Sequence, residues 1–156
     1  MLALILALAA AATPVPPGEQ PVDPYAAADA NAGATPVAGQ RLWHAFHEQP
    51  GVDRIVDSLV SRAIVDPRIA EIFKGQDIVR LRRTLKEQFC YLLGGGCRYS
   101  GREMAASHHN LGIQTKDFNA LVDDLQQAMS RERVSPFAQN RLLAKLAPMK
   151  RSVVER

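Results

Sequence analysis

Apolar side chains recur every three or four residues through most of the chain from Arg41 onward, which is the spacing of a helix with one buried face. No stretch of that region sustains the strict alternation of apolar and polar residues that is typical of a half-buried strand. The pattern therefore predicts one all-α domain over residues 41–156.

Capping residues, prolines and glycines set the expected limits of the helices. Asp77 and Ser135 are predicted N-caps, and a proline follows Ser135 at the first helical position. Pro50 and Gly51 are expected to separate the first two helices, and Pro148 is expected to kink the last one. The expected helices cover residues 42–48, 52–63, 67–73, 78–92, 102–110, 115–129 or 117–129, and 136–146.

The first 40 residues differ from the rest of the chain, since they contain no Lys or Arg. Residues 1–12 form an apolar run that is shorter than the about 20 residues of a membrane span. We interpret this run as a signal peptide of an exported, periplasmic protein, although no basic residue precedes it. The alternatives are an uncleaved leader that tethers the chain to a membrane, and a cytoplasmic protein with a misassigned start. Residues 13–40 are rich in Pro, Ala and Gly and predict a flexible linker, because they can bury little apolar surface.

The formal net charge of the chain is +3, and the domain itself is more basic than that. Of the 16 acidic residues, Glu19, Asp23 and Asp29 precede the domain, so 13 remain there against 19 basic residues. A basic surplus can indicate nucleic-acid binding. The basic cluster at residues 80–86 contains no aromatic side chain, however, and a solvated helix face explains it equally well. We therefore expect no nucleic-acid partner.

The two cysteines, Cys90 and Cys97, have neither the C-x-x-C nor the C-x-x-C-H spacing, which excludes a c-type haem attachment motif. Two alternatives remain for them. In an exported protein they could form a disulfide, because the glycines at 94–96 allow the chain to fold back. Otherwise they are free thiols, buried or half-buried.

The segment CRYSGREMAASHHNLGI, residues 97–113, places a histidine pair in a distinctive setting. Its fixed points are Tyr99, Gly101, Met104, His108, Gly112 and Ile113. This arrangement resembles the corresponding stretch of group I truncated haemoglobins. The resemblance continues in VDPRIAEIFKG at 65–75, LLGGG at 92–96 and FNALVDDLQQAM at 118–129, and it covers about residues 42–154.

The resemblance implies the truncated globin fold, a two-over-two helical sandwich, and a haem b cofactor, iron protoporphyrin IX. His108 is the implied iron ligand, because it stands four residues after Met104 and five before Ile113, whereas His109 is expected to be exposed. Arg82 is a candidate partner of a haem propionate, with a solvated position as the alternative. The implied haem contacts are Leu59, Val60, Phe73, Leu81, Arg82, Thr84, Leu85, Met104, Ile113, Phe118 and Val122.

The chain departs from the family on the distal side, which is opposite the iron ligand. Many members place a tyrosine on the second helix and a glutamine on the long helix, and both donate hydrogen bonds to bound dioxygen. Here the corresponding positions are Val60, Leu81 and Leu85, all apolar, and Thr84 and Gln88 are the nearest polar side chains. We therefore predict fast dioxygen release, easy oxidation to the ferric form and relatively better binding of carbon monoxide or nitric oxide.

A second departure lies in the first loop, where the family has a Gly-Gly pair and this chain has His47 and Glu48. His44 and His47 could in principle ligate a metal. We expect them to lie on a surface loop instead.

Taken together, these features predict a haem protein that binds, stores or transports a diatomic gas: dioxygen, carbon monoxide or nitric oxide. Nitric oxide dioxygenase or peroxidase-like side activity stays open. Dioxygenase turnover would need an unidentified reductase, because the chain has no flavin or dinucleotide motif. The alternative function is an exported all-helical binding or adaptor domain that kept the globin architecture but lost haem. A membrane is an expected partner only through an uncleaved leader.

Overall fold

The computed structural model describes residues 14–155, so the predicted leader lies outside the described residues. The described part is helical throughout and contains no strand, which confirms the predicted all-α class. The α-helices are α1 Arg41–Ala45, α2 Glu48–Ala63, α3 Ile78–Leu92, α4 Met104–His108, α5 Thr115–Arg131, α6 Pro136–Leu146 and α7 Lys150–Val153, and the 3₁₀ helices are η1 Asp29–Ala32, η2 Ala70–Phe73 and η3 Ala147–Met149. Within residues 14–155, no helix combines the length and the apolar character that crossing a bilayer requires.

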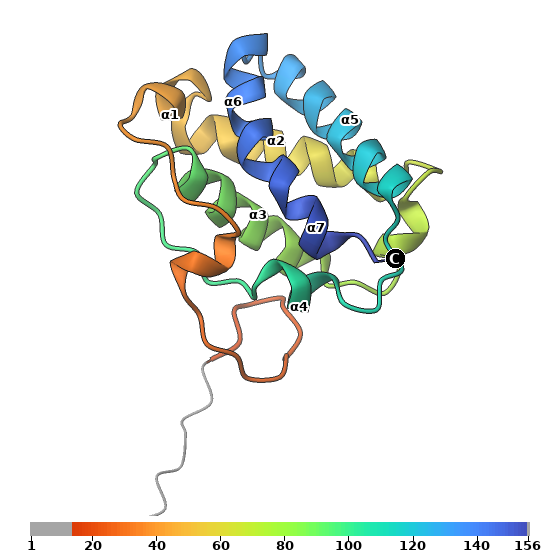
Figure 1. Ribbon diagram of the computed structural model, residues 1–156. Helices are drawn as coiled ribbons and strands as arrows, with labels where there is room; N and C mark the ends of the chain where they lie inside the picture. The colour runs from red at the N-terminus through yellow and green to blue at the C-terminus, as the bar shows by residue number, and fades with distance from the viewer. Residues whose placement is uncertain (1–13, 156) are drawn as a thin grey trace, which may run out of the picture.

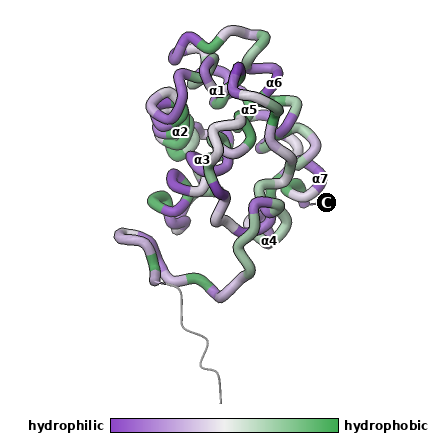
Figure 2. The backbone as a smooth tube through the Cα atoms, turned by 90° about the vertical axis from the view of Figure 1, so that its left-hand side faces the viewer, coloured by the Kyte–Doolittle hydropathy of each residue, from purple (hydrophilic) through white to green (hydrophobic). Residues whose placement is uncertain are grey.

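The helices pack as two pairs around one core. Helix α2 packs against α3 on one side and α5 on the other, and α6 lies beside α5 and crosses in front of α2 (Figure 1). Polar and apolar stretches alternate along the tube of α2 (Figure 2), as expected for a helix with one buried face. That face carries Ile55, Val56, Leu59 and Val60, all of which are buried.

The predicted N-caps of two long helices are confirmed. The Asp77 carboxylate accepts a hydrogen bond from the Arg80 backbone N–H at 2.9 Å, and α3 then runs to Leu92, where the glycines begin. The Ser135 hydroxyl accepts one from the Ala138 N–H at 3.3 Å at the start of α6. Pro148 lies in η3, which separates α6 from α7, so the predicted kink is also confirmed.

The prediction that Pro50 and Gly51 separate two helices is wrong. Helix α2 begins at Glu48 and runs through both residues. Pro50 is tolerated because the first N–H groups of a helix have no acceptor inside it. Gly51 is required there, because a Cβ atom at this position would lie 1.9 Å from the carbonyl oxygen of Phe46. The chain therefore turns between α1 and α2 at Phe46 and His47, ahead of Pro50 and Gly51.

Phe137 is a large apolar residue of α6 that does not face the core. Its side chain is 72% exposed, whereas Leu142 on the same helix is fully buried. Phe137 is the second residue of α6, just past the Ser135 cap, where the helix projects beyond its neighbours (Figure 1).

Residues 14–40, predicted to be a flexible linker, instead run along the domain. Figure 1 shows this segment looping past α4 and rising beside α3 to reach α1. Ala32 is fully buried, and the side chain of Glu19 is only 1% exposed. The segment buries little apolar surface, as its composition predicts, but polar contacts with the domain hold it in place.

Cys90 and Cys97 form a disulfide, so the second of the two alternatives, free thiols, is not what the structure contains. Their Cα atoms lie 5.7 Å apart, and the chain folds back between them at Gly94, which has a φ of 84°. Because glycine adopts a positive φ without steric cost, the glycine-rich turn makes the bridge possible. The disulfide ties the loop before α4 to the end of α3.

Candidate functional site

His108 ends the short helix α4 with its imidazole half-buried. Its Nδ1 lies 2.7 Å from the carbonyl oxygen of Met104, one turn earlier. A carbonyl only accepts hydrogen bonds, so Nδ1 carries the proton and Nε2 keeps its lone pair. Burial lowers the pKa of the imidazole, an effect that outweighs the bond to Met104. His108 therefore presents a neutral nitrogen donor in the tautomer that metal-binding histidines adopt.

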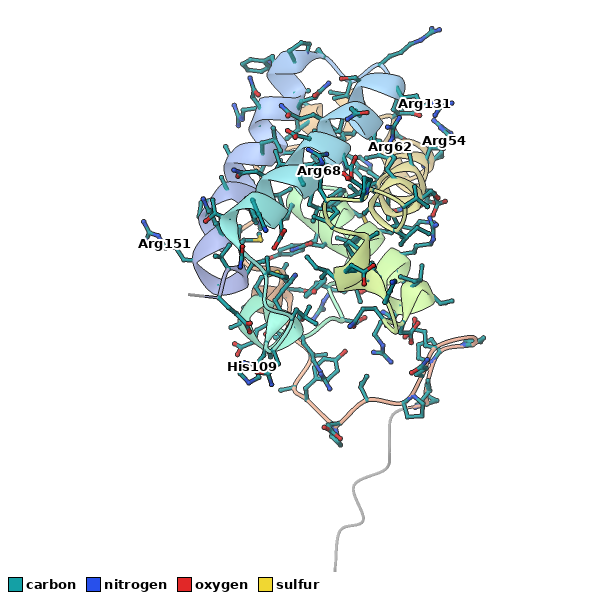
Figure 3. All side chains as sticks on the ribbon, turned by 90° about the vertical axis from the view of Figure 1, so that its right-hand side faces the viewer. Arg54, Arg62, Arg68, His109, Arg131 and Arg151 are labelled. Carbon is teal, nitrogen blue, oxygen red and sulfur yellow. A yellow bond between two sulfur atoms is a disulfide. The ribbon has the colours of Figure 1, made fainter. Side chains whose placement is uncertain are left out.

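The other three histidines lie at the surface. Figure 3 shows His109 at the outer end of α4, and its side chain is 74% exposed. His44 lies 2.8 Å from Glu48, and His47 lies 3.2 Å from Glu132. Both lie on the surface as expected, but only His47 lies in the turn between α1 and α2, because His44 belongs to helix α1. Of the four histidines, His108 alone is not exposed.

The side chains predicted around the cofactor divide into two groups by burial. Leu59, Val60 and Ile113 are buried. The others are only partly buried, although they lie on the inner parts of the fold: Phe73, Leu81, Arg82, Thr84, Leu85, Met104, Phe118 and Val122. Partly exposed leucine and phenylalanine side chains on facing helices are what a flat apolar ligand would cover.

One apolar cluster contains seven of the predicted contacts: Leu59, Val60, Leu81, Leu85, Met104, Ile113 and Phe118. Phe73 packs in a second, smaller cluster with Ala63, Ile69 and Ala120. Val122 belongs to neither cluster of the described residues. Helices α3 and α4, which carry the two sides of the site, make few direct contacts, because α4 packs mainly on α7.

The distal side contains no hydrogen-bond donor that is free to turn inward among the side chains predicted there. Val60 and the leucines at 81 and 85 are apolar. The Thr84 hydroxyl donates to the carbonyl oxygen of Arg80 at 3.0 Å, within its own helix. The Gln88 amide donates to the carbonyl oxygen of Ala32 at 2.8 Å. Both polar residues that could have compensated for the missing tyrosine already have partners.

The arginines of α3 already have partners within the protein. Arg82 donates to the Asp57 carboxylate and to the Ser61 hydroxyl, both at 3.0 Å, and so it faces α2. Arg83 pairs with Glu19 and Glu87, and these hydrogen bonds raise the pKa of its guanidinium. A propionate contact of Arg82 stays a prediction, and it would compete with the bonds to α2.

The donor set fits a metal that brings most of its own ligands. Among residues 14–155, no three His, Cys, Asp or Glu side chains gather closely enough to hold a bare ion. One half-buried neutral imidazole suits an iron whose four equatorial ligands come from a porphyrin. The residues present therefore fit a haem held on one side by His108.

Sequence reasoning missed the residues of the N-terminal segment that contact the site. Glu19 pairs with Arg80 and Arg83 of α3, and Asp29 accepts a hydrogen bond from the Tyr99 N–H at 2.9 Å. The available signal was charge: isolated acids in a segment without basic residues, opposite a basic cluster on the long helix. That pattern favours docking of the segment over free movement.

Comparisons with known proteins agree with this geometry. A family model described as bacterial-like globin matches residues 42–155. The chain is similar to the group 1 truncated hemoglobin GlbN of Nostoc sp. (strain MUN 8820), with 30% identity over 108 residues that cover 69% of this chain and 92% of the relative. The GlbN protein of Nostoc commune is 29% identical over the same shares of each chain.

Solved structures of the same kind are similar in fold. The Fe(III) form of truncated hemoglobin from Tetrahymena pyriformis has a TM-score of 0.70 and 17% identity, covering 74% of this chain and 98% of that one. The 2/2 hemoglobin of Synechococcus sp. PCC 7002, in the cyanomet state with covalently attached heme, has a TM-score of 0.68 and 22% identity over the same shares. The predicted two-over-two helical sandwich is thereby confirmed.

Proposed function

The chain belongs to the bacterial-like globin family, and from this premise we propose that it holds haem b through His108 and binds a diatomic gas on the opposite side. Gas binding is the general function of truncated hemoglobins, and haem is the group that a globin carries. Beyond these general properties, we propose the type of haem, the residue that ligates its iron and the gas that binds best.

The observation that carries it is the state of the His108 side chain. Its Nδ1 is bonded to the Met104 carbonyl and its pKa is lowered by burial, so Nε2 is unprotonated at neutral pH. A haem bound there would supply an iron to which a gas can bind. His108 would hold the iron, the Met104 carbonyl would orient the imidazole, and the apolar side chains would exclude water from the porphyrin.

The distal side chains favour gases that do not need a hydrogen bond. Bound dioxygen carries partial negative charge, and a hydrogen bond to a charged group contributes about 1.5–3 kcal/mol, roughly ten- to hundredfold in affinity. With Val60, Leu81 and Leu85 on that side, this gain is absent. Dioxygen release and oxidation to the ferric form should therefore be fast, and carbon monoxide or nitric oxide should bind comparatively better.

A ferrous absorption spectrum tests the haem proposal directly. The purified protein reconstituted with haem b should show a Soret band that shifts with carbon monoxide. His108→Ala should abolish the five-coordinate histidine spectrum, and the matched variant His109→Ala should retain it. A chain that takes up no haem would favour the adaptor alternative, and an unchanged spectrum in His108→Ala would refute the ligand assignment.

We also propose that the protein is exported to an oxidising compartment. The disulfide between Cys90 and Cys97 supports this, because such bonds persist outside the cytosol and are rare within it. Mass spectrometry of the native protein from fractionated cells would check the proposal, since export requires a periplasmic protein without the apolar leader. The intact chain in the cytosolic fraction would contradict it.

Nitric oxide dioxygenation, the activity that the sequence leaves open, would need one electron from outside in each cycle. That electron would have to come from a separate reductase, because the chain lacks a dinucleotide motif. Nitrate formation that depends on an added reductase would support this activity.

A further inference from the structure

One segment connects the two sides of the site, which lie on helices α3 and α4 that make few direct contacts with each other. We call residues 19–37 the N-terminal strap. On the α3 side, the Glu19 carboxylate pairs with Arg80 at 3.3 Å and also with Arg83. Farther along, the Val37 N–H donates to the Leu92 carbonyl oxygen at 2.9 Å. The strap is therefore fastened at both ends of α3.

Between these two anchors, the strap contacts the loop of residues 97–103, which leads directly into α4. The Asp29 carboxylate accepts from the Tyr99 N–H at 2.9 Å. The Asn31 amide donates to the Gly101 carbonyl oxygen at 3.1 Å. The Tyr25 hydroxyl donates to the Ser100 carbonyl oxygen at 2.6 Å. Three successive residues of the loop are thus held by the strap.

The rest of the protein holds this loop mainly at Cys97 and Ser100. The disulfide fixes Cys97. The Glu87 carboxylate accepts from the Ser100 N–H at 2.9 Å and from the Ser100 hydroxyl at 2.7 Å, and Arg83 donates to that hydroxyl at 2.6 Å. The backbone of Tyr99 and Gly101 has no comparable hydrogen bond to a helix among the described residues. The strap therefore supplies the contacts that fix the last part of the loop before α4.

Helix α4 packs on α7, and its orientation depends also on the segments that flank it. It has five residues, and a helix that short is not stable on its own. On its far side, the Glu155 carboxylate accepts from the Gly112 N–H at 2.8 Å, which holds the chain after His108. On its near side, the corresponding support comes from the strap and its contacts with the loop.

We propose that Asp29 and Asn31 are positioning residues for His108: through the loop at residues 97–103 they set the direction from which the imidazole meets the haem iron. The inference rests on the proposed function, since it concerns the geometry of the iron ligand. It assigns to the N-terminal strap a role in cofactor retention that the globin helices alone do not fulfil.

The test compares strap variants of the full chain after loading with haem b. Asp29→Ala/Asn31→Ala removes both hydrogen bonds to the loop backbone and the ion pair of Asp29 with the exposed Arg98. Asp23→Ala is the matched control, because the Asp23 carboxylate makes no hydrogen bond or ion pair among the described residues, and Arg102 donates only to the Asp23 backbone. Asp29→Asn keeps an oxygen that can accept from the Tyr99 N–H, and so it should restore most of the function. The two readouts are the iron–histidine stretching frequency of the ferrous protein and the rate of haem transfer to excess apomyoglobin.

The double variant should shift the iron–histidine frequency and release haem about tenfold faster, the effect expected from losing two hydrogen bonds. Asp23→Ala and Asp29→Asn should stay close to the parent protein on both readouts. An unchanged frequency and transfer rate in the double variant would overturn the proposal.

Hydrogen exchange of the haem-free protein separates this inference from the proposed function. The double variant should lose protection within residues 97–108 and keep it in α2 and α5. Loss spread evenly over all the helices would mean general destabilisation and would overturn the positioning role. If the parent protein binds no haem, the proposed function fails, whereas the exchange result still decides whether the strap orders α4.

Discussion

The two sides of the candidate site are built in different ways. The distal side lies on long helices, with Leu59 and Val60 on α2 buried to 2% and 1% exposure. The proximal side rests on the five residues of α4, from Met104 to His108. Polar contacts and a disulfide hold the segments on either side of that short helix.

This difference shows where each side is sensitive to change. The distal side is set by apolar packing between helices, which tolerates replacements of similar volume. The proximal side is set by a few hydrogen bonds between segments distant in sequence, so single polar substitutions should affect it. Distal substitutions should therefore change gas selection, and proximal ones should change how firmly the cofactor is held.

Removal of the disulfide should have the largest effect on stability. For Cys90→Ala/Cys97→Ala, we expect the free energy of unfolding to fall by about 2–3 kcal/mol, because the bridge closes a short loop in the unfolded chain. Chemical denaturation at equilibrium measures the change, and hydrogen exchange locates it. The exchange rates should rise first in residues 97–108, on the proximal side. A uniform rise in every helix would contradict the division between the two sides.

A donor placed on the distal side should reverse the predicted gas preference. Val60→Tyr puts a hydroxyl where many relatives carry one and should slow dioxygen release about ten- to hundredfold, corresponding to about 1.5–3 kcal/mol. The larger side chain should cost about 1–3 kcal/mol of stability through overpacking. Val60→Phe is the matched control for volume, and stopped-flow release rates are the measurement. Equal rates in the two variants would mean that no hydrogen bond forms.

The helix packing behind the distal side contains one acid whose replacement should have a smaller effect. Asp124 on α5 is 4% exposed, and burial, followed by the nearby charge of Asp66, raises the pKa of its carboxyl. Ionised Asp124 therefore penalises the folded state, and stability is lost as the pH rises from the ordinary value of about 3.9 through the raised pKa.

Asp124→Asn should stabilise the protein by about 1 kcal/mol at pH 7, a typical size for a single substitution. The gain should shrink as the pH approaches about 4, where the parent carboxyl is protonated in both states. Thermal unfolding at a series of pH values measures it, and Asp123→Asn on the exposed neighbour is the control. A gain that is independent of pH would show that ionisation is not its cause.

Much of the helical framework was predictable because its signals are local. Asp77 and Ser135 cap the helices they were expected to cap, since the N-cap bond joins residues only three positions apart. Pro50 was wrongly predicted to interrupt a helix, because the destabilisation by a proline depends on how far it lies from the start of the helix. Here the start is set by the close approach of Gly51 to the backbone of Phe46. Whether the two cysteines form a disulfide or stay free thiols was likewise not determined by the sequence and is shown only by the folded structure.

The sequence by itself determined the all-α class and, through the positions of Met104 and Ile113, which histidine of the pair to examine. Only the tertiary structure decided that Thr84 and Gln88 are already bonded, that Arg82 faces α2, and that the first 40 residues include a strap. Periodicity and capping act within a few residues of the chain, and a sequence shows them directly. The strap contacts join residues about 70 positions apart, such as Asn31 and Gly101, and they exist only once the helices have brought those residues together.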